Sequence, residues 1–215
     1  MSARTTRGSA LMPLTGVLFV VLTVVSFVVG GETPDADAPA REVVDYWTDH
    51  EGENMIGSVI EALAAVTLLF FAATLRRTLK GWADHSILPL VAYAGGIVAA
   101  AGIGVDASIR FAAADVAGDV DPAVLQTFSA MWANFFFPIV VGLASLIVAT
   151  SLAGWRARAL PMWITSIGLL IFIAFFTPAG FVAFLVGGVW IIVLSVLLWR
   201  RESHTSGEST SSALA

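Results

Sequence analysis

Long apolar runs alternate with short charged clusters along the whole chain. A bilayer core about 30 Å thick needs about 20 helical residues, because each residue of an α-helix rises about 1.5 Å. The predicted spanning helices cover residues 11–30, 54–76, 87–111, 123–153, 160–177 and 181–199. The pattern therefore predicts an all-α integral membrane bundle of six transmembrane helices, forming one domain over residues 1–201.

The last two helices are inferred by dividing one uncharged run. No charge occurs between Arg158 and Arg200, and as a single helix this stretch would be about 60 Å long, twice the thickness of a bilayer core. Thr-Pro-Ala-Gly at 177–180 lies near its midpoint, and Pro and Gly interrupt helices. We therefore expect a tight hairpin at this point.

The basic residues set the expected orientation, because Lys and Arg are retained on the cytoplasmic side of a membrane. Of the 11 Lys and Arg residues, nine fall on one side of the six-helix arrangement, and only Arg41 and Arg110 fall on the other. Both termini are then expected in the cytoplasm, with the chain in the plasma membrane. Residues 11–30 also fit a signal sequence, but their length favours a spanning helix.

The connection at residues 31–53 is acidic and is expected to face outward. Its apolar positions share one helical face after Pro39, which predicts a short amphipathic interfacial helix; they are Ala40, Val43, Val44 and Trp47. Asp45 and Asp49 lie one helical turn apart, so they are weak candidates for a divalent cation such as calcium. A solvated acidic face explains the same spacing.

Composition narrows the possible functions. The chain is 58% hydrophobic and 13% charged, against roughly 25% charged residues in soluble domains, so the lipid bilayer is its expected surrounding. A net charge of -5 without a basic patch argues against a nucleic-acid partner. There is no cysteine, and all three histidines fall outside the predicted spans, so no metal, haem or other cofactor is expected. Residues 202–215 are rich in Ser, Thr and Gly and are predicted to be a disordered cytoplasmic tail.

Three ionisable residues fall within the predicted spans. Glu61 lies inside the second span, and Asp106 and Arg110 lie four residues apart near the outer end of the third. Charged groups at membrane depth are costly and usually have partners, so all three are expected to meet at one level. The cluster is either a site for a proton, a cation or a polar substrate group, or a structural ion-pair network.

Asn134 is expected to join this cluster from the fourth span. Pro138 cannot donate a backbone hydrogen bond, so it frees the carbonyl of the residue four positions earlier and kinks the helix. A free carbonyl beside a side-chain amide would form a small polar pocket. The alternative is that a neighbouring helix or water satisfies both groups.

A face of small residues lies on the third predicted span. Gly96, Ala100 and Gly104 are four residues apart, the spacing that lets two helix backbones approach closely. This face is predicted to be a packing seam, either within the bundle or with a second copy or a partner membrane protein.

Three functions compete. The favoured interpretation is a non-enzymatic structural or interaction protein that packs through the small-residue face. The alternative is a small transporter or ion-coupled carrier that uses Glu61, Asp106, Arg110 and Asn134 on a small molecule or ion. A membrane-embedded enzyme acting on a lipid is the least favoured, because a carboxylate and an amide are its only support and no catalytic motif occurs.

The layout resembles a family of small membrane proteins of high-GC Gram-positive bacteria. The resemblance spans most of the chain and rests on five short motifs: Gly-Glu-Thr-Pro at 31–34, Val-Val-Asp-Tyr-Trp at 43–47, Phe-Phe at 70–71, Asn-Phe-Phe-Phe-Pro at 134–138 and Thr-Pro-Ala-Gly-Phe at 177–181. What it implies is a plasma-membrane location and a family without an assigned activity, so it identifies no catalytic residue.

Overall fold

The computed structural model describes residues 11–31, 33–34, 38–82 and 85–212, with side chains as far as Ser203. Every regular element in this part of the chain is helical. The elements are η1 (Met12–Leu14), α2 (Thr15–Gly30), α3 (Ala40–Asp49), α4 (Glu51–Trp82), α5 (Leu88–Asp115), α6 (Pro122–Asn134), α7 (Phe137–Arg156), α8 (Met162–Ala174) and α9 (Gly180–Ser212).

Five helical stretches are long and apolar enough to cross a membrane: Met12–Gly30, Glu51–Trp82, Leu88–Asp115, Pro122–Arg156 and Gly180–Ser203. Their outward side chains are large and apolar, as expected for surfaces that contact lipid. The all-helical membrane class predicted from the sequence is therefore confirmed. The helix expected at residues 160–177 is present as α8, which has 13 residues and is shorter than these five.

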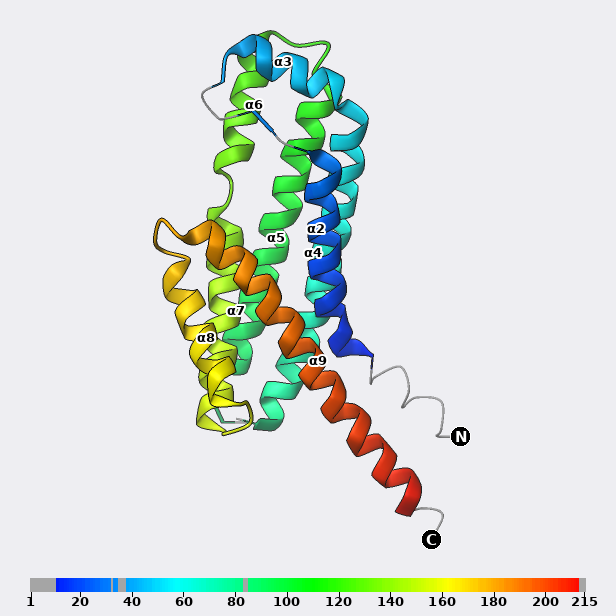
Figure 1. The fold of residues 1–215 in the computed structure, drawn as a ribbon, viewed down its shortest axis with the longest axis vertical. Coiled ribbons are helices and arrows are strands. Elements are labelled where there is room, and N and C mark those ends of the chain that lie inside the picture. Colours follow the sequence, from blue (N-terminus) through cyan, green and yellow to red (C-terminus); the bar gives the residue numbers. More distant parts are fainter. Residues whose placement is uncertain (1–10, 32, 35–37, 83–84, 213–215) are drawn as a thin grey trace.

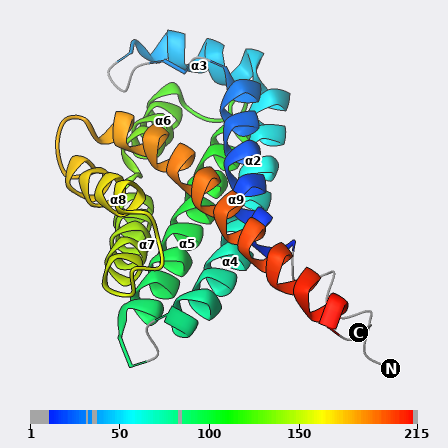
Figure 2. The ribbon, with the colours of Figure 1, turned by 60° about the horizontal axis from the view of Figure 1, so that its bottom comes forward.

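The main core forms where α5 packs against α4 on one side and α7 on the other (Figure 1). α2 packs against α4, while α8 and α9 form a hairpin, in which α8 packs against α7 and α9 crosses the bundle obliquely to reach α2 and η1 (Figures 1 and 2). The largest side chains that are fully enclosed in this core are Leu68, Phe71, Leu75, Leu79, Leu146, Ile147, Ile164, Ile191, Leu194 and Leu198.

The single kinked helix predicted for residues 123–153 is instead two helices. α6 ends at Asn134, Phe135 and Phe136 are not helical, and α7 begins at Phe137. Pro138 lies in the first turn of α7, where its missing N–H is tolerated because the first turn has no intrahelical acceptors for its donors. The proline thus starts a new helix and does not kink a continuous one.

α5 and α7 approach each other closely through a face of α5 that lies next to the one predicted from the sequence. A Cβ on Gly95 would lie 2.7 Å from the Gly142 carbonyl oxygen, and one on Gly142 would overlap the backbone of Ala99. Gly96 and Ala100 are buried in the chain's own bundle, with Gly96 facing Ala72 of α4. Gly104, the third predicted member of the seam, has open space beside its Cα.

The predicted helix in the outer connection is confirmed as α3, but its apolar face is not free to lie on lipid. α3 lies crosswise over the end of the bundle (Figure 1), and Val43 and Trp47 are buried with Ala113 of α5 and Leu125 of α6. This second hydrophobic core is separate from the main one. It makes α3 a cap on the helix ends.

Most predicted helix bounds lie within a few residues of those in the structure, and α4 and α9 extend further at the ends away from α3. α9 continues to Ser212, where the sequence predicted disorder from residue 202. Extending an existing helix costs much less than starting one, which favours this continuation. Arg77 of α4 and Glu202 of α9 form an ion pair of 3.4 Å at this end. Residues 213–215 lie outside the described part of the chain.

Candidate intramembrane polar site

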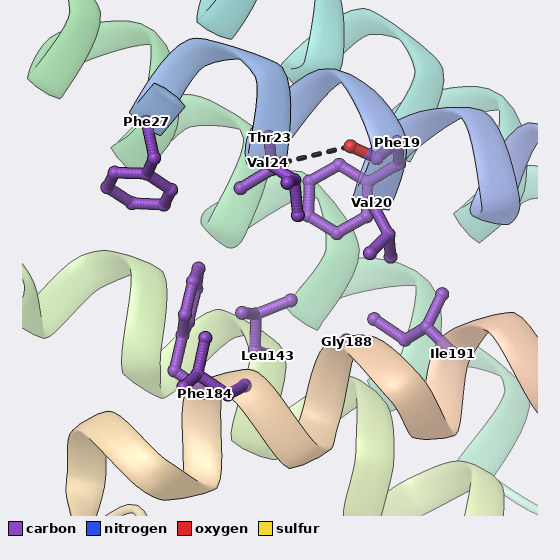
Figure 3. Close-up of a pocket in the computed structure, with 10 residues that line it drawn as sticks. Phe19, Val20, Thr23, Val24, Phe27, Leu143, Phe184, Gly188 and Ile191 are labelled. Atoms are coloured by element: carbon purple, nitrogen blue, oxygen red, sulfur yellow. Dashed lines mark hydrogen bonds between the residues drawn. The ribbon is translucent and has the colours of Figure 1, made fainter. Parts of the chain in front are cut away.

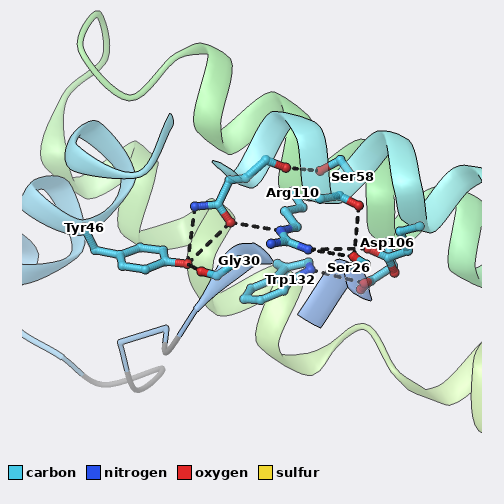
Figure 4. Close-up of polar contacts among 10 residues, drawn as sticks. Ser26, Gly30, Tyr46, Ser58, Asp106, Arg110 and Trp132 are labelled. Atoms are coloured by element: carbon cyan, nitrogen blue, oxygen red, sulfur yellow. Dashed lines mark hydrogen bonds and ion pairs between the residues drawn. The ribbon is translucent and has the colours of Figure 1, made fainter. Parts of the chain in front are cut away.

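Arg110 is the centre of a buried polar site between α2, α4 and α5, near the end of the bundle that α3 covers. Its side chain is almost fully enclosed, with 2% of the residue exposed. The Nε atom donates to Oδ1 of Asn54 at 2.9 Å, and Nη1 donates to Oγ of Ser26 at 3.1 Å (Figure 4). Two neutral acceptors on two different helices therefore fix the guanidinium.

Two glycines make room for the guanidinium. A Cβ on Gly57 of α4 would lie 2.7 Å from Nη2 of Arg110, and a Cβ on Gly30 of α2 would overlap the same nitrogen. Ser26 donates its hydroxyl to the Gly57 carbonyl at 2.9 Å, which holds α2 and α4 together at this level. The sequence thus provides a cradle that fits one planar cation.

Two carboxyl groups face this single cation. Oε2 of Glu61 lies 3.9 Å from Nη1 of Arg110, and the Glu61 side chain is 14% exposed. Asp106 accepts a hydrogen bond of 3.1 Å from Nε1 of Trp132 on α6. The carboxyl groups of Glu61 and Asp106 also lie close enough to interact, and they can share a hydrogen bond only when one of them is protonated, because two carboxylates are both acceptors.

The site is connected to the cap by a chain of hydrogen bonds. The Tyr46 hydroxyl of α3 donates to the Gly30 carbonyl at 2.8 Å and accepts from Nδ2 of Asn54 at 3.3 Å (Figure 4). Burial raises the pKa of the Tyr46 phenol above its ordinary value, while the hydrogen bond with Asn54 opposes this shift. Tyr46 is therefore a neutral link between α3 and the Arg110 partners.

Trp132 borders the site on the side of α6. Its ring lies under the Arg110 guanidinium, 5.7 Å from Cζ to the ring centroid. The same ring meets Trp47 of α3 edge to face, with centroids 5.9 Å apart. Aromatic rings attract both cations and the edges of other rings, so Trp132 contacts the polar site and the cap together.

The structure brings together three of the four residues predicted for this cluster, Glu61, Asp106 and Arg110. Asn134 does not join them: it is exposed at the end of α6, and its amide donates to the Ala130 carbonyl of its own helix at 2.7 Å. The break after Asn134 explains this outcome, because the carbonyl that a continuous helix would have left free is no longer inside a helix.

Sequence reasoning did not identify four further members of the site: Ser26, Asn54, Tyr46 and Trp132. Ser26 and Asn54 are polar residues in or beside apolar runs, which is a usable signal. Tyr46 and Trp132 resemble ordinary aromatic residues near a membrane boundary, and only their placement in the fold gives them a role.

The weak cation site suggested by Asp45 and Asp49 gains no support from the geometry. Both residues are exposed on α3, and Asp45 lies 3.8 Å from the guanidinium of Arg41. Across the described residues, no group of three or more His, Asp or Glu side chains is arranged to hold a metal ion.

Two hollows lie outside the polar site. An apolar one of about 70 Å³ separates α2 from α9 and is lined by residues that include Phe27, Phe184 and Gly188 (Figure 3). A more open one of about 250 Å³ lies between α4 and α5, beside Ser58, Gly104 and Phe111. Both have the predominantly apolar walls expected of surfaces that contact lipid chains.

Comparisons of the chain with protein-family models, with curated proteins and with solved structures find no match.

Proposed function

We propose that the protein is a small membrane carrier that binds a proton or a monovalent cation at Glu61 and Asp106. The observation behind this proposal is the unequal number of charges in the site. Two carboxyl groups face one buried guanidinium, Arg110, whose hydrogen bonds to Asn54 and Ser26 hold it in place. A structural ion pair needs only one carboxylate.

The second carboxyl group determines what the site can bind. If both carboxylates were ionised next to one guanidinium, the site would carry a net charge of about -1, which is unfavourable in a low-dielectric environment. A proton or one monovalent cation neutralises that charge. A divalent cation would leave an excess of positive charge beside the fixed Arg110, so monovalent species are favoured.

Partial exposure supports reversible binding. Arg110 is enclosed, whereas Glu61 keeps 14% of its side chain exposed and Asp106 is half-buried. The site thus combines an enclosed cation with carboxyl groups that are partly exposed. Intramembrane carboxyl groups of this kind commonly mark proton or ion pathways.

The competing proposal, a structural or interaction protein, depends on a free face of small residues. Gly96 and Ala100 pack inside the chain's own bundle, so that face offers no surface for a second copy. A metal-dependent lipid-modifying enzyme would need a group of metal ligands near the carboxyl groups, and the described residues contain none. The hydroxyl groups nearest the site, Ser26 and Ser58, donate to backbone carbonyls. The carrier is therefore the better-supported of the three proposals.

The proposal includes six membrane crossings, with both termini in the cytoplasm and the chain in the plasma membrane. α9 packs against η1, so both ends of the described chain lie at one end of the bundle (Figure 1). This arrangement supports an even number of crossings with α8 as one of them. The uneven distribution of basic residues and the resemblance to membrane proteins of high-GC Gram-positive bacteria support the same topology and location.

The proposal is tested by carbodiimide labelling of the protein in native membranes, followed by peptide mass spectrometry. An apolar carbodiimide reacts with a protonated carboxyl group in an apolar environment. We expect labelling of Glu61 or Asp106 that decreases as the pH is raised. Glu53, which is exposed at the outer end of the same helix, is the matched control and should not be labelled.

Flux measurements then separate binding from transport. In proteoliposomes containing a pH-sensitive dye, the wild-type protein should dissipate an imposed proton or sodium gradient, and Glu61→Gln should abolish this activity while Glu53→Gln retains it. If neither Glu61 nor Asp106 is labelled at any pH, and no gradient is dissipated, the carrier proposal is wrong.

A further inference from the structure

The cap at the outer end of the molecule has its own hydrophobic core. Val43 and Trp47 of α3, Leu125 of α6 and Ala113 of α5 are buried together, apart from the main core. Gln126 of α6 also donates to the Ala38 carbonyl at 2.9 Å, which ties α6 to the chain just before α3. Because Ala113 belongs to α5, this core joins the cap to the end of the main bundle, and opening the cap would expose Ala113 while the main core stays intact.

α6 is joined to α7 through a short non-helical link. Phe135 and Phe136 separate it from α7, and Pro138 has no N–H with which to continue a helical ladder across the break. The main contacts of α6 are with α3 and α5. A short non-helical link between two helices is a typical hinge, because a few backbone dihedral angles absorb the change in direction.

Trp132 connects α6 directly to the carboxyl pair by a hydrogen bond, while Tyr46 connects α3 to Gly30 and Asn54. Nε1 of Trp132 on α6 donates to Oδ2 of Asp106 at 3.1 Å (Figure 4). The ring of Trp132 also contacts the ring of Trp47 on α3, which links the two cap helices. Movement of α6 and α3 together away from α5 would therefore break the bond to Asp106 and also the Tyr46 hydrogen bonds to Gly30 and Asn54.

We propose that α6, with α3 packed on it, is the outer gate of the site, and that Trp132 is the latch that holds it closed on Asp106. This inference rests on the proposed function, because it describes how the carboxyl pair gains access to the outer side. Opening pivots at Phe135 and Phe136. Arg110 stays in place, since its acceptors belong to α2 and α4.

The gate is tested by the rate of thiol labelling at a position beneath the cap. The chain contains no cysteine, so Ala113→Cys introduces a single thiol at a fully buried position on α5. In sealed proteoliposomes, a membrane-impermeant maleimide reaches it only when the cap opens. Trp132→Phe keeps an aromatic ring but removes the donor to Asp106, and we expect it to increase the labelling rate about tenfold or more, as for loss of a hydrogen bond to a charged group.

Three further variants make the test specific. Trp163→Phe changes a tryptophan that is 54% exposed on α8 and should leave the rate unchanged. Asp106→Leu removes the acceptor of the same hydrogen bond and should raise the thiol-labelling rate as much as Trp132→Phe does. The double variant should show no further increase. Leu68→Cys, fully buried in the main core, should remain unlabelled in every background.

The results separate the gate from the proposed function. An unchanged rate in Trp132→Phe overturns the gate, and so does an equal rise at Leu68→Cys, which would mean that the whole fold has loosened. Carbodiimide labelling of Glu61 in the same samples reports on the binding site independently. Labelled Glu61 with unchanged thiol rates would refute the gate alone, whereas labelling of neither Glu61 nor Asp106 counts against the function regardless of the thiol rates.

Discussion

Glu61 and Arg110 should respond very differently to loss of charge, because the guanidinium has other partners. Glu61 Oε2 lies 3.9 Å from Nη1, beyond hydrogen-bonding distance, whereas Nε lies 2.9 Å from Oδ1 of Asn54. At 3.9 Å the attraction is about 4 kcal/mol at an effective dielectric constant of about 20, and repulsion from Asp106 opposes it. We therefore expect Glu61→Gln to change the free energy of unfolding by less than about 1 kcal/mol.

Arg110→Met is expected to be severe. It removes the positive charge from an almost fully buried position and leaves Glu61 and Asp106 facing each other, with the Asn54 acceptor unsatisfied. Removing one partner of a buried ion pair costs about 3–5 kcal/mol. For a chain of this size, each 1 kcal/mol shifts the melting temperature by about 2–4 °C, so the expected fall is about 6–20 °C.

The assay is the melting temperature of the purified wild type, Glu61→Gln and Arg110→Met in the same detergent at neutral pH. Arg41→Met is the matched control, because Arg41 pairs with Asp45 at 3.8 Å on an exposed surface and should cost less than about 1 kcal/mol. If Glu61→Gln lowers the melting temperature as much as Arg110→Met, the reasoning is refuted. Glu61 would then be the structural counter-ion of Arg110, and only Asp106 would remain for a ligand.

Further predictions concern the glycines and the cap. Gly57→Ala should destabilise the protein by about 1–3 kcal/mol through overpacking against the buried guanidinium, while Gly52→Ala, in open space on the same helix, should stabilise it by about 0.5–1 kcal/mol. Gly95→Ala should lower the melting temperature, because its Cβ would meet the backbone of α7, whereas Gly104→Ala should not. Burial raises the pKa of Tyr46 above 10.0, so the stability due to its neutral form is present below pH 10 and is lost as the pH rises through the folded-state pKa. Thermal unfolding at alkaline pH should therefore show a loss that Tyr46→Phe removes.

The sequence by itself determined the membrane class and the positions of most helices, because the length of an apolar run and the charges that bound it are local properties. It also predicted α3 from the spacing of its apolar residues. Glu61, Asp106 and Arg110 were expected to meet because each lies at a similar distance from the outer end of its helix, and the structure brings them together. The sequence predicted a kink at Pro138 in one helix, whereas the structure has a break at Phe135 and Phe136 and Pro138 in the first turn of the next helix.

Only the tertiary structure decided which of two neighbouring faces of α5 packs closely against α7. Gly95 and Gly96 are adjacent in the sequence but about 100° apart around the helix, and the rotation of α5 about its axis depends on the sum of its contacts with α4 and α7. The packing of all the helices also brings Asn54 and Ser26 into hydrogen bonds with the Arg110 guanidinium, and Trp132 into a hydrogen bond with Asp106. No local pattern specifies these partners, because each comes from a helix distant in the sequence and reaches the site only after every helix has packed.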